Sequence, residues 1–101
     1  MEPHDYFASR QLTAAGQLKV KLVFNDGRYS ILIPRDISYM ELVDRVEQKL
    51  SLVGEFTPGS PALRLKYRDE DGDLITINSN DDIQMALETY CYANIHLFVN
   101  V

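Results

Sequence analysis

Near the start of the chain, apolar residues alternate with polar ones: single residues separate Leu18, Val20, Leu22 and Phe24. A period of two is typical of a β-strand with one buried face. Lys19 and Lys21 occupy intervening positions, so we expect both lysines on the face opposite the core. The turn-forming residues 25–27 and a second β-rich run, residues 29–33, follow directly. This pattern predicts a β-hairpin.

Two later segments change to the spacing of an amphipathic helix. In the first, the apolar positions are Met40, Val43, Val46 and Leu50, and Ser38 precedes them with Glu41 three residues on. This combination predicts a capped helix over residues 39–51. In the second, the apolar positions are Ile83, Ala86, Leu87 and Tyr90. We expect Ser79 or Asn80 to cap that helix.

Alternation also predicts strands over residues 63–68, 74–77 and 95–101, which gives the order ββαββαβ. One sheet with an apolar face needs a cover, and two amphipathic helices provide it. The predicted fold class is therefore α+β: a ubiquitin-like β-grasp roll with a mixed five-stranded sheet covered by two helices. Periodicity alone leaves the order of the strands in space open.

The length of 101 residues, 46% of them hydrophobic, suits one domain with one core. Residues 1–17 show no period, and we expect a flexible arm there, followed by an interaction domain over residues 18–101. No run approaches the ~20 apolar residues of a membrane span, and the first residues do not resemble a signal peptide. We therefore expect a cytoplasmic protein without a membrane span.

Charge is divided unevenly along the chain. Residues 1–68 contain all ten Lys and Arg with eight Asp and Glu, whereas residues 69–101 contain seven acidic residues and no Lys or Arg. Nucleic-acid binding requires a dominant basic surface, so the sequence argues against a nucleic-acid partner. The acidic third of the chain favours a partner with a basic surface.

Six acidic residues lie in two groups within residues 69–82: Asp69, Glu70, Asp71, Asp73, Asp81 and Asp82. The spacing of the first three aspartates resembles an EF-hand, but Leu74 and Asn80 stand where that loop needs a glycine and a glutamate. Catalysis by two carboxylates needs a pocket that separates their pKa values, and a polar turn offers none. The single Cys91 with two histidines forms no metal or nucleophile motif. We expect no catalytic residue, metal or cofactor.

The segment from Tyr67 to Asp73 resembles the acidic OPCA-type motif of the PB-one (PB1) domain. The Ser-Asn-Asp-Asp helix start and the Leu-Phe-Val strand that follow the segment belong to the same resemblance. This family is named for phagocyte oxidase and Bem proteins, and the resemblance covers about residues 18–101. It implies a protein-interaction module that docks front to back, with the acidic face of one domain on the lysine-bearing basic face of another.

The resemblance also assigns residues to the two faces. The acidic face would comprise Asp69, Glu70, Asp71, Asp73, Asp81 and Asp82, with Asn80 where family members commonly carry another acid. The possible basic face would comprise Lys21, with Lys19 as the alternative, and Arg28. Ser30 and Leu32 stand where strongly self-associating members carry basic residues, so self-association through Lys21 is expected to be the weaker mode.

Other functions and hosts remain open at the level of sequence. A small-GTPase-binding β-grasp domain would instead use the basic residues of the first two strands. A ubiquitin-like modifier would need a terminal Gly-Gly, where this chain has Asn100-Val101. The resemblance suggests a fungal polarity Rho guanine-nucleotide exchange factor or a trafficking scaffold as the host.

Overall fold

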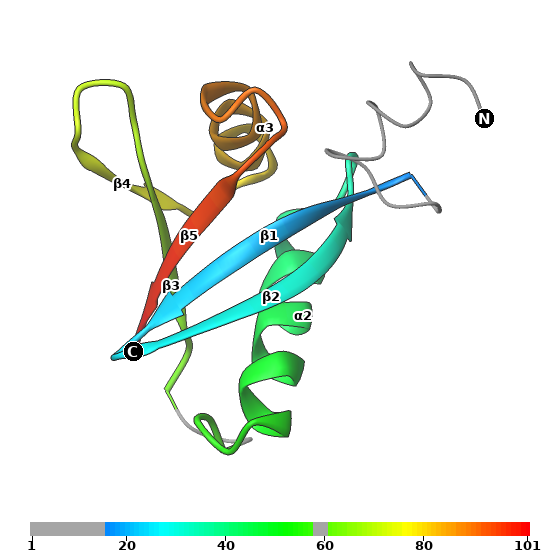
Figure 1. Cartoon of the computed structure of the whole chain (residues 1–101), viewed down its shortest axis with the longest axis vertical. Helices are drawn as coiled ribbons and strands as arrows, with labels where there is room; N and C mark the ends of the chain where they lie inside the picture. The colour runs from blue at the N-terminus through cyan, green and yellow to red at the C-terminus, as the bar shows by residue number, and fades with distance from the viewer. Residues whose placement is uncertain (1–15, 58–60) are drawn as a thin grey trace.

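The structure, a computed structural model, describes residues 16–57 and 61–101. Its elements follow the order β1 (Gln17–Phe24), β2 (Gly27–Pro34), α2 (Tyr39–Leu52), β3 (Arg64–Arg68), β4 (Leu74–Ile77), α3 (Asn80–Thr89) and β5 (Ile95–Asn100). Figure 1 shows this arrangement. The predicted order ββαββαβ is confirmed within the described residues. The expected arm falls almost entirely on residues 1–15, which lie outside them.

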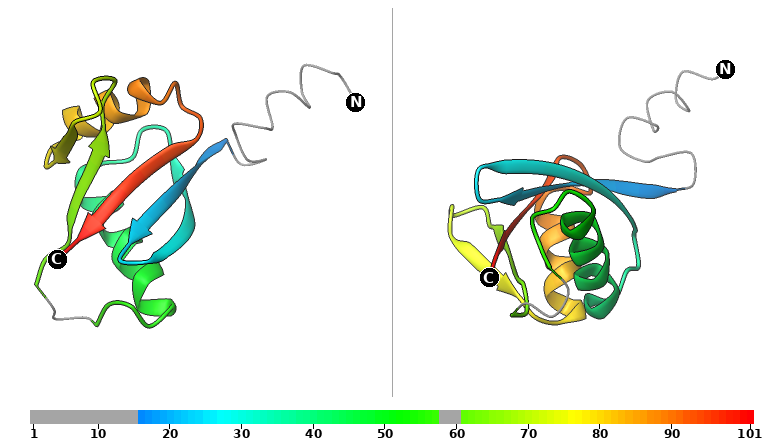
Figure 2. Two further views of the ribbon diagram at one scale, coloured as in Figure 1. Left: turned by 60° about the vertical axis from the view of Figure 1, so that its left-hand side comes forward. Right: turned by 90° about the horizontal axis from the view of Figure 1, so that it is seen from below.

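The sheet has the strand order β2-β1-β5-β3-β4. β1 and β2 form the predicted antiparallel hairpin, β5 pairs in parallel with β1, and β3 is antiparallel to both β4 and β5. The sheet curls around the two helices, which cover its inner face and leave the outer face convex (Figure 2). This is the mixed sheet of the ubiquitin-like β-grasp roll.

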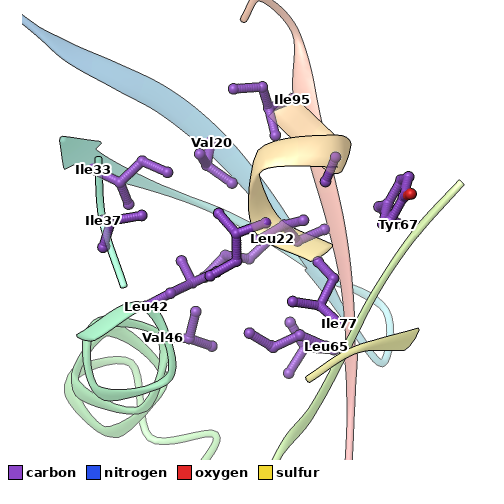
Figure 3. Close-up of a cluster of buried hydrophobic side chains, with 14 of the residues drawn as sticks. Val20, Leu22, Ile33, Ile37, Leu42, Val46, Leu65, Tyr67, Ile77 and Ile95 are labelled. Atoms are coloured by element: carbon purple, nitrogen blue, oxygen red, sulfur yellow. The ribbon is translucent and has the colours of Figure 1, made fainter. Parts of the chain in front are cut away.

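The core lies between the inner face of the sheet and the two helices. β1 contributes Leu18, Val20, Leu22 and Phe24, all nearly inaccessible, and these are the residues that alternation placed on the buried face. Helix α2 packs against them through Leu42, Val46 and Leu50. Figure 3 shows how these apolar side chains from sheet and helix meet, with Tyr67 at the margin of the cluster. Burial of this apolar surface stabilises the fold.

The buried side of α2 differs from the sequence prediction at its first turn. Met40, expected on the packed face, is 81% exposed, whereas Leu42 is buried. Ser38 caps the helix as predicted, because its Oγ accepts a hydrogen bond from the Glu41 backbone N–H. The Glu41 carboxylate pairs with Arg45 one turn later.

Candidate interaction surface

The turn between β3 and β4 is built around the side chain of Asp69. Its Oδ1 accepts the backbone N–H groups of Asp71 and Asp73 at 3.0 and 2.9 Å. Gly72 adopts the left-handed conformation that this tight turn requires, with a φ of 86°. Arg68 donates from its guanidinium to the Gly72 carbonyl at 2.6 Å and does not reach a carboxylate of the turn among the described residues.

Because Asp69 shapes the turn, three carboxylates gather at one point. Carboxylate oxygens of Asp69, Asp71 and Asp73 lie within 4.8 Å of one another. Asp71 and Asp73 are exposed, and Asp69 is half-buried. Within residues 16–57 and 61–101, the ion pair recorded is Arg45 with Glu41, so no cation neutralises this cluster there. Like charges this close repel each other, and a cation placed among them would relieve the repulsion.

These residues do not form an EF-hand loop. Leu74 begins β4 and Asn80 begins α3, so the second half of the expected metal loop is a strand and a helix start. The glycine bend and the bidentate glutamate of such a loop are therefore replaced by residues that cannot fulfil those roles.

The second acidic group lies at the start of α3. Ser79 is the N-cap, because its Oγ accepts from the Asp82 backbone N–H, and Asp82 Oδ2 in turn accepts from the Asn78 backbone N–H at 3.0 Å. Asp81 and Asp82 lie in the first turn, where the positive end of the helix dipole stabilises negative charge.

Asn80, the departure from the acidic pattern, has a structural role. Its Oδ1 accepts the backbone N–H of Tyr39 at 2.7 Å, so a side chain at the start of α3 satisfies a free donor at the start of α2. Gln84 adds a second link by donating to the Arg35 carbonyl. The two helix starts are therefore held side by side.

Tyr67 connects the two acidic groups. Its pKa is raised above the ordinary value of 10.0, first by burial and then by the charges of Asp69, Asp82 and Glu70. A carboxylate affects a neighbouring pKa in this way only at short range. Asp69 and Glu70 of the turn and Asp82 of α3 therefore all act on the same phenol.

Sequence reasoning missed Glu88 and Met85. Both line a hollow of about 500 Å³ between the turn and α3, together with Asp69 and Glu70. Met85 is 47% exposed. Helical spacing was the available signal, because Met85 and Glu88 lie four and seven residues beyond Asp81. We define the acidic surface as Asp69, Glu70, Asp71, Asp73, Asp81, Asp82 and Glu88.

The lysines of β1 lie on the opposite side of the sheet from the helices. Lys19 and Lys21 are exposed, and Lys21 pairs in register with Ser30 of β2 and His96 of β5. Arg28 pairs with Val23 and is also exposed. Beyond Arg28, the outward positions of β2 are Ser30 and Leu32, as the sequence predicted.

Comparisons with known proteins agree with this architecture. The sequence model of the PB1 domain matches residues 17–101. The chain is also 47% identical over 60 residues to the Rho guanine nucleotide exchange factor scd1 of Schizosaccharomyces pombe. That alignment covers 58% of this chain and 7% of the relative, so the chain spans a small part of the relative's length.

Solved structures show the same fold. The AtNBR1-PB1 domain superposes with a TM-score of 0.64 at 16% identity, covering 84% of this chain and 97% of that one. The PB1 domain of Cdc24p in its long form gives a TM-score of 0.63 at 21% identity, covering 83% and 94%. A filament of AtNBR1-PB1 gives 0.58 at 22% identity, covering 84% and 94%. With the family match extending over most of its length, the chain belongs to the PB1 domain family of protein-interaction modules.

Proposed function

We propose that the acidic surface binds the lysine-bearing basic face of another PB1 domain and so assembles a signalling or scaffold complex. The observation that carries this proposal is the cluster of Asp69, Asp71 and Asp73 carboxylates within 4.8 Å, without a neutralising cation among the described residues. An ammonium group of a partner would meet several negative oxygens at once.

The magnitude favours several contacts around one lysine over isolated pairs. A single exposed ion pair contributes only about 0.2–1 kcal/mol. Close charge pairs at a desolvated interface couple by about 1.5–7 kcal/mol. Asp71 and Asp73 carry most of this interaction, because one oxygen of Asp69 is already engaged by two backbone N–H groups.

The basic face of the chain supports self-association less well. Lys21 has Ser30 beside it, and Lys19 has Leu32, so β2 contributes Arg28 as its outward cation. The expected assembly is therefore a heterodimer in which this chain supplies the acidic surface. A front-to-back homo-oligomer through Lys21 is the weaker mode.

The Rho guanine nucleotide exchange factor that the chain matches suggests which kind of longer protein would contain this domain. Because the matched relative is a Rho guanine nucleotide exchange factor, we propose that the chain serves as the interaction domain of such a factor in cell-polarity signalling. In that setting it would operate in the cytoplasm and position the host protein without catalysing a reaction itself.

The test uses a defined basic partner made from the chain itself. A probe with Ser30→Arg and Leu32→Arg adds two cations to the face that holds Lys21, and Asp71→Lys in the probe prevents it from binding its own copies. Isothermal titration calorimetry of the unaltered chain with this probe should show binding. Asp73→Lys in the chain that binds the probe should abolish binding, whereas Glu47→Lys in the same chain, which makes the same charge change on α2, should preserve it.

Unchanged affinity of Asp73→Lys for the probe would refute the proposal. The alternative of small-GTPase binding through the first two strands makes the opposite prediction for a GTPase partner. There, Lys21→Glu would abolish binding and Asp71→Lys would leave it intact.

A further inference from the structure

The outer face of the sheet carries a basic surface that extends well beyond Lys21. Outward positions on three strands hold six cations: Lys19, Lys21, Arg28, Arg64, Lys66 and Arg68. None of the five strands contains an aspartate or glutamate. The helices cover the other side of the sheet, so this convex face is directed to solvent (Figure 2).

Most of these cations have no anionic partner within the part of the chain that the structure describes. Arg68 differs, since it donates to the Gly72 carbonyl and lies over the Phe98 ring at 5.4 Å. The other five, Lys19, Lys21, Arg28, Arg64 and Lys66, form no ion pair with a described carboxylate. The chain carries a formal charge of −5 and still leaves this face without internal neutralisation.

The register of the strands fixes how far these charges spread. Arg28 pairs with Val23, Val23 with Phe98, and Phe98 with Lys66, so one row crosses four strands. At a strand spacing of about 4.8 Å, the backbone positions of Arg28 and Lys66 at its two ends lie about 14 Å apart along the sheet. The two side chains between them, Val23 and Phe98, are half-buried and apolar.

The carboxylate oxygens of this chain's own acidic turn lie within 4.8 Å of one another, so a turn of that size on a partner would engage only part of this spread at a time. The arrangement also lacks the features of a nucleic-acid site. Single-stranded nucleic acids stack their bases on open aromatic rings in a basic groove. Here the outward ring of Phe98 is already covered by Arg68, and the face is convex.

We propose that the outer face of the sheet docks on the surface of an anionic lipid bilayer. Anionic headgroups form a broad sheet of charge, and several separated cations on long side chains can reach it together. Val23 then lies at the boundary between headgroups and acyl chains, as apolar groups of peripheral proteins do. No helix in the described part of the chain is long and apolar enough to cross a bilayer, so the docking is peripheral.

The proposal is tested by sedimenting the chain with phosphatidylcholine vesicles that contain or lack phosphatidylserine. We expect binding only to the vesicles with phosphatidylserine, with a partition coefficient that falls as salt is added. Arg64→Glu combined with Lys66→Glu should lower that coefficient by about tenfold or more, because each Lys or Arg near such a surface is worth about fivefold. This double substitution leaves Lys21 unchanged.

A matched control reverses two cations outside the sheet strands, Arg35→Glu with Lys49→Glu, and should retain most of the binding. Circular dichroism and thermal unfolding establish that both double variants are folded. Equal losses in the two variants would show that only net charge matters and would overturn the proposal. Equal binding to neutral and anionic vesicles, or binding of a single-stranded oligonucleotide through Arg64 and Lys66 in place of vesicles, would also overturn it.

Discussion

The acidic motif combines a structural aspartate with aspartates that are free to bind, and substitution separates the two. Asp69 Oδ1 accepts two backbone hydrogen bonds at 3.0 and 2.9 Å, whereas the exposed side chain of Asp71 accepts none within the described residues. Asp69→Ala should therefore destabilise the fold, and Asp71→Ala should not. Both remove one negative charge, so each serves as a control for the other.

The size of the effect follows from the hydrogen bonds that are lost. A hydrogen bond to a charged group contributes about 1.5–3 kcal/mol. Because Asp69 is half-buried and one oxygen serves both donors, we take the lower end and expect a loss of about 2 kcal/mol in total. Asp71→Ala should change the free energy of unfolding by less than about 0.5 kcal/mol, as surface substitutions usually do.

Urea unfolding followed by circular dichroism measures this difference, with the m-value checking that unfolding remains two-state. Asp69→Asn should recover part of the loss, because its amide oxygen still accepts the two N–H groups without the charge. Equal stability of Asp69→Ala and Asp71→Ala would refute the assignment of a structural role to Asp69.

Three further outcomes are expected. Asn80→Ala should lower the free energy of unfolding by about 1 kcal/mol in urea, because it leaves the Tyr39 N–H without its acceptor; an unchanged urea midpoint would contradict this. Stability should fall as the pH rises above 10.0, the ordinary pKa of tyrosine, because Tyr67 keeps its proton to higher pH in the folded chain than in the unfolded one. Tyr67→Phe should reduce the slope of the unfolding free energy against pH. Association with the basic probe should weaken as salt is added, and stopped-flow mixing that shows a salt-independent association rate would argue against electrostatic docking.

Local patterns predicted most of the fold. The alternation in residues 18–24 identified the buried face of β1. Ser38 identified the start of α2, and the choice of Ser79 or Asn80 identified that of α3, because capping depends on neighbouring residues alone. The order β2-β1-β5-β3-β4 could not be obtained this way. Pairing between distant strands depends on the packing of the whole chain and leaves no local period.

The site was predicted less completely, for a similar reason. The resemblance to the PB-one motif assigned the turn aspartates to one surface, but the separate role of Asp69 depends on where its Oδ1 points within the turn. The bond from Tyr39 to Asn80 joins residues 41 positions apart, and nothing in either local sequence indicates it. Met40 was assigned to the core on spacing, yet the position of α2 on the sheet leaves it exposed and buries Leu42.

A charge-swap cycle between the chain and the basic probe tests the docking model most directly. Asp73→Lys in the chain and Lys21→Asp in the probe are each expected to prevent binding, and calorimetry of the two variants together should show binding restored. The account predicts a favourable coupling energy of about 1.5 kcal/mol or more between the two positions. Losses that simply add, with no recovery in the swapped pair, would contradict direct contact between the acidic surface and the partner's lysine.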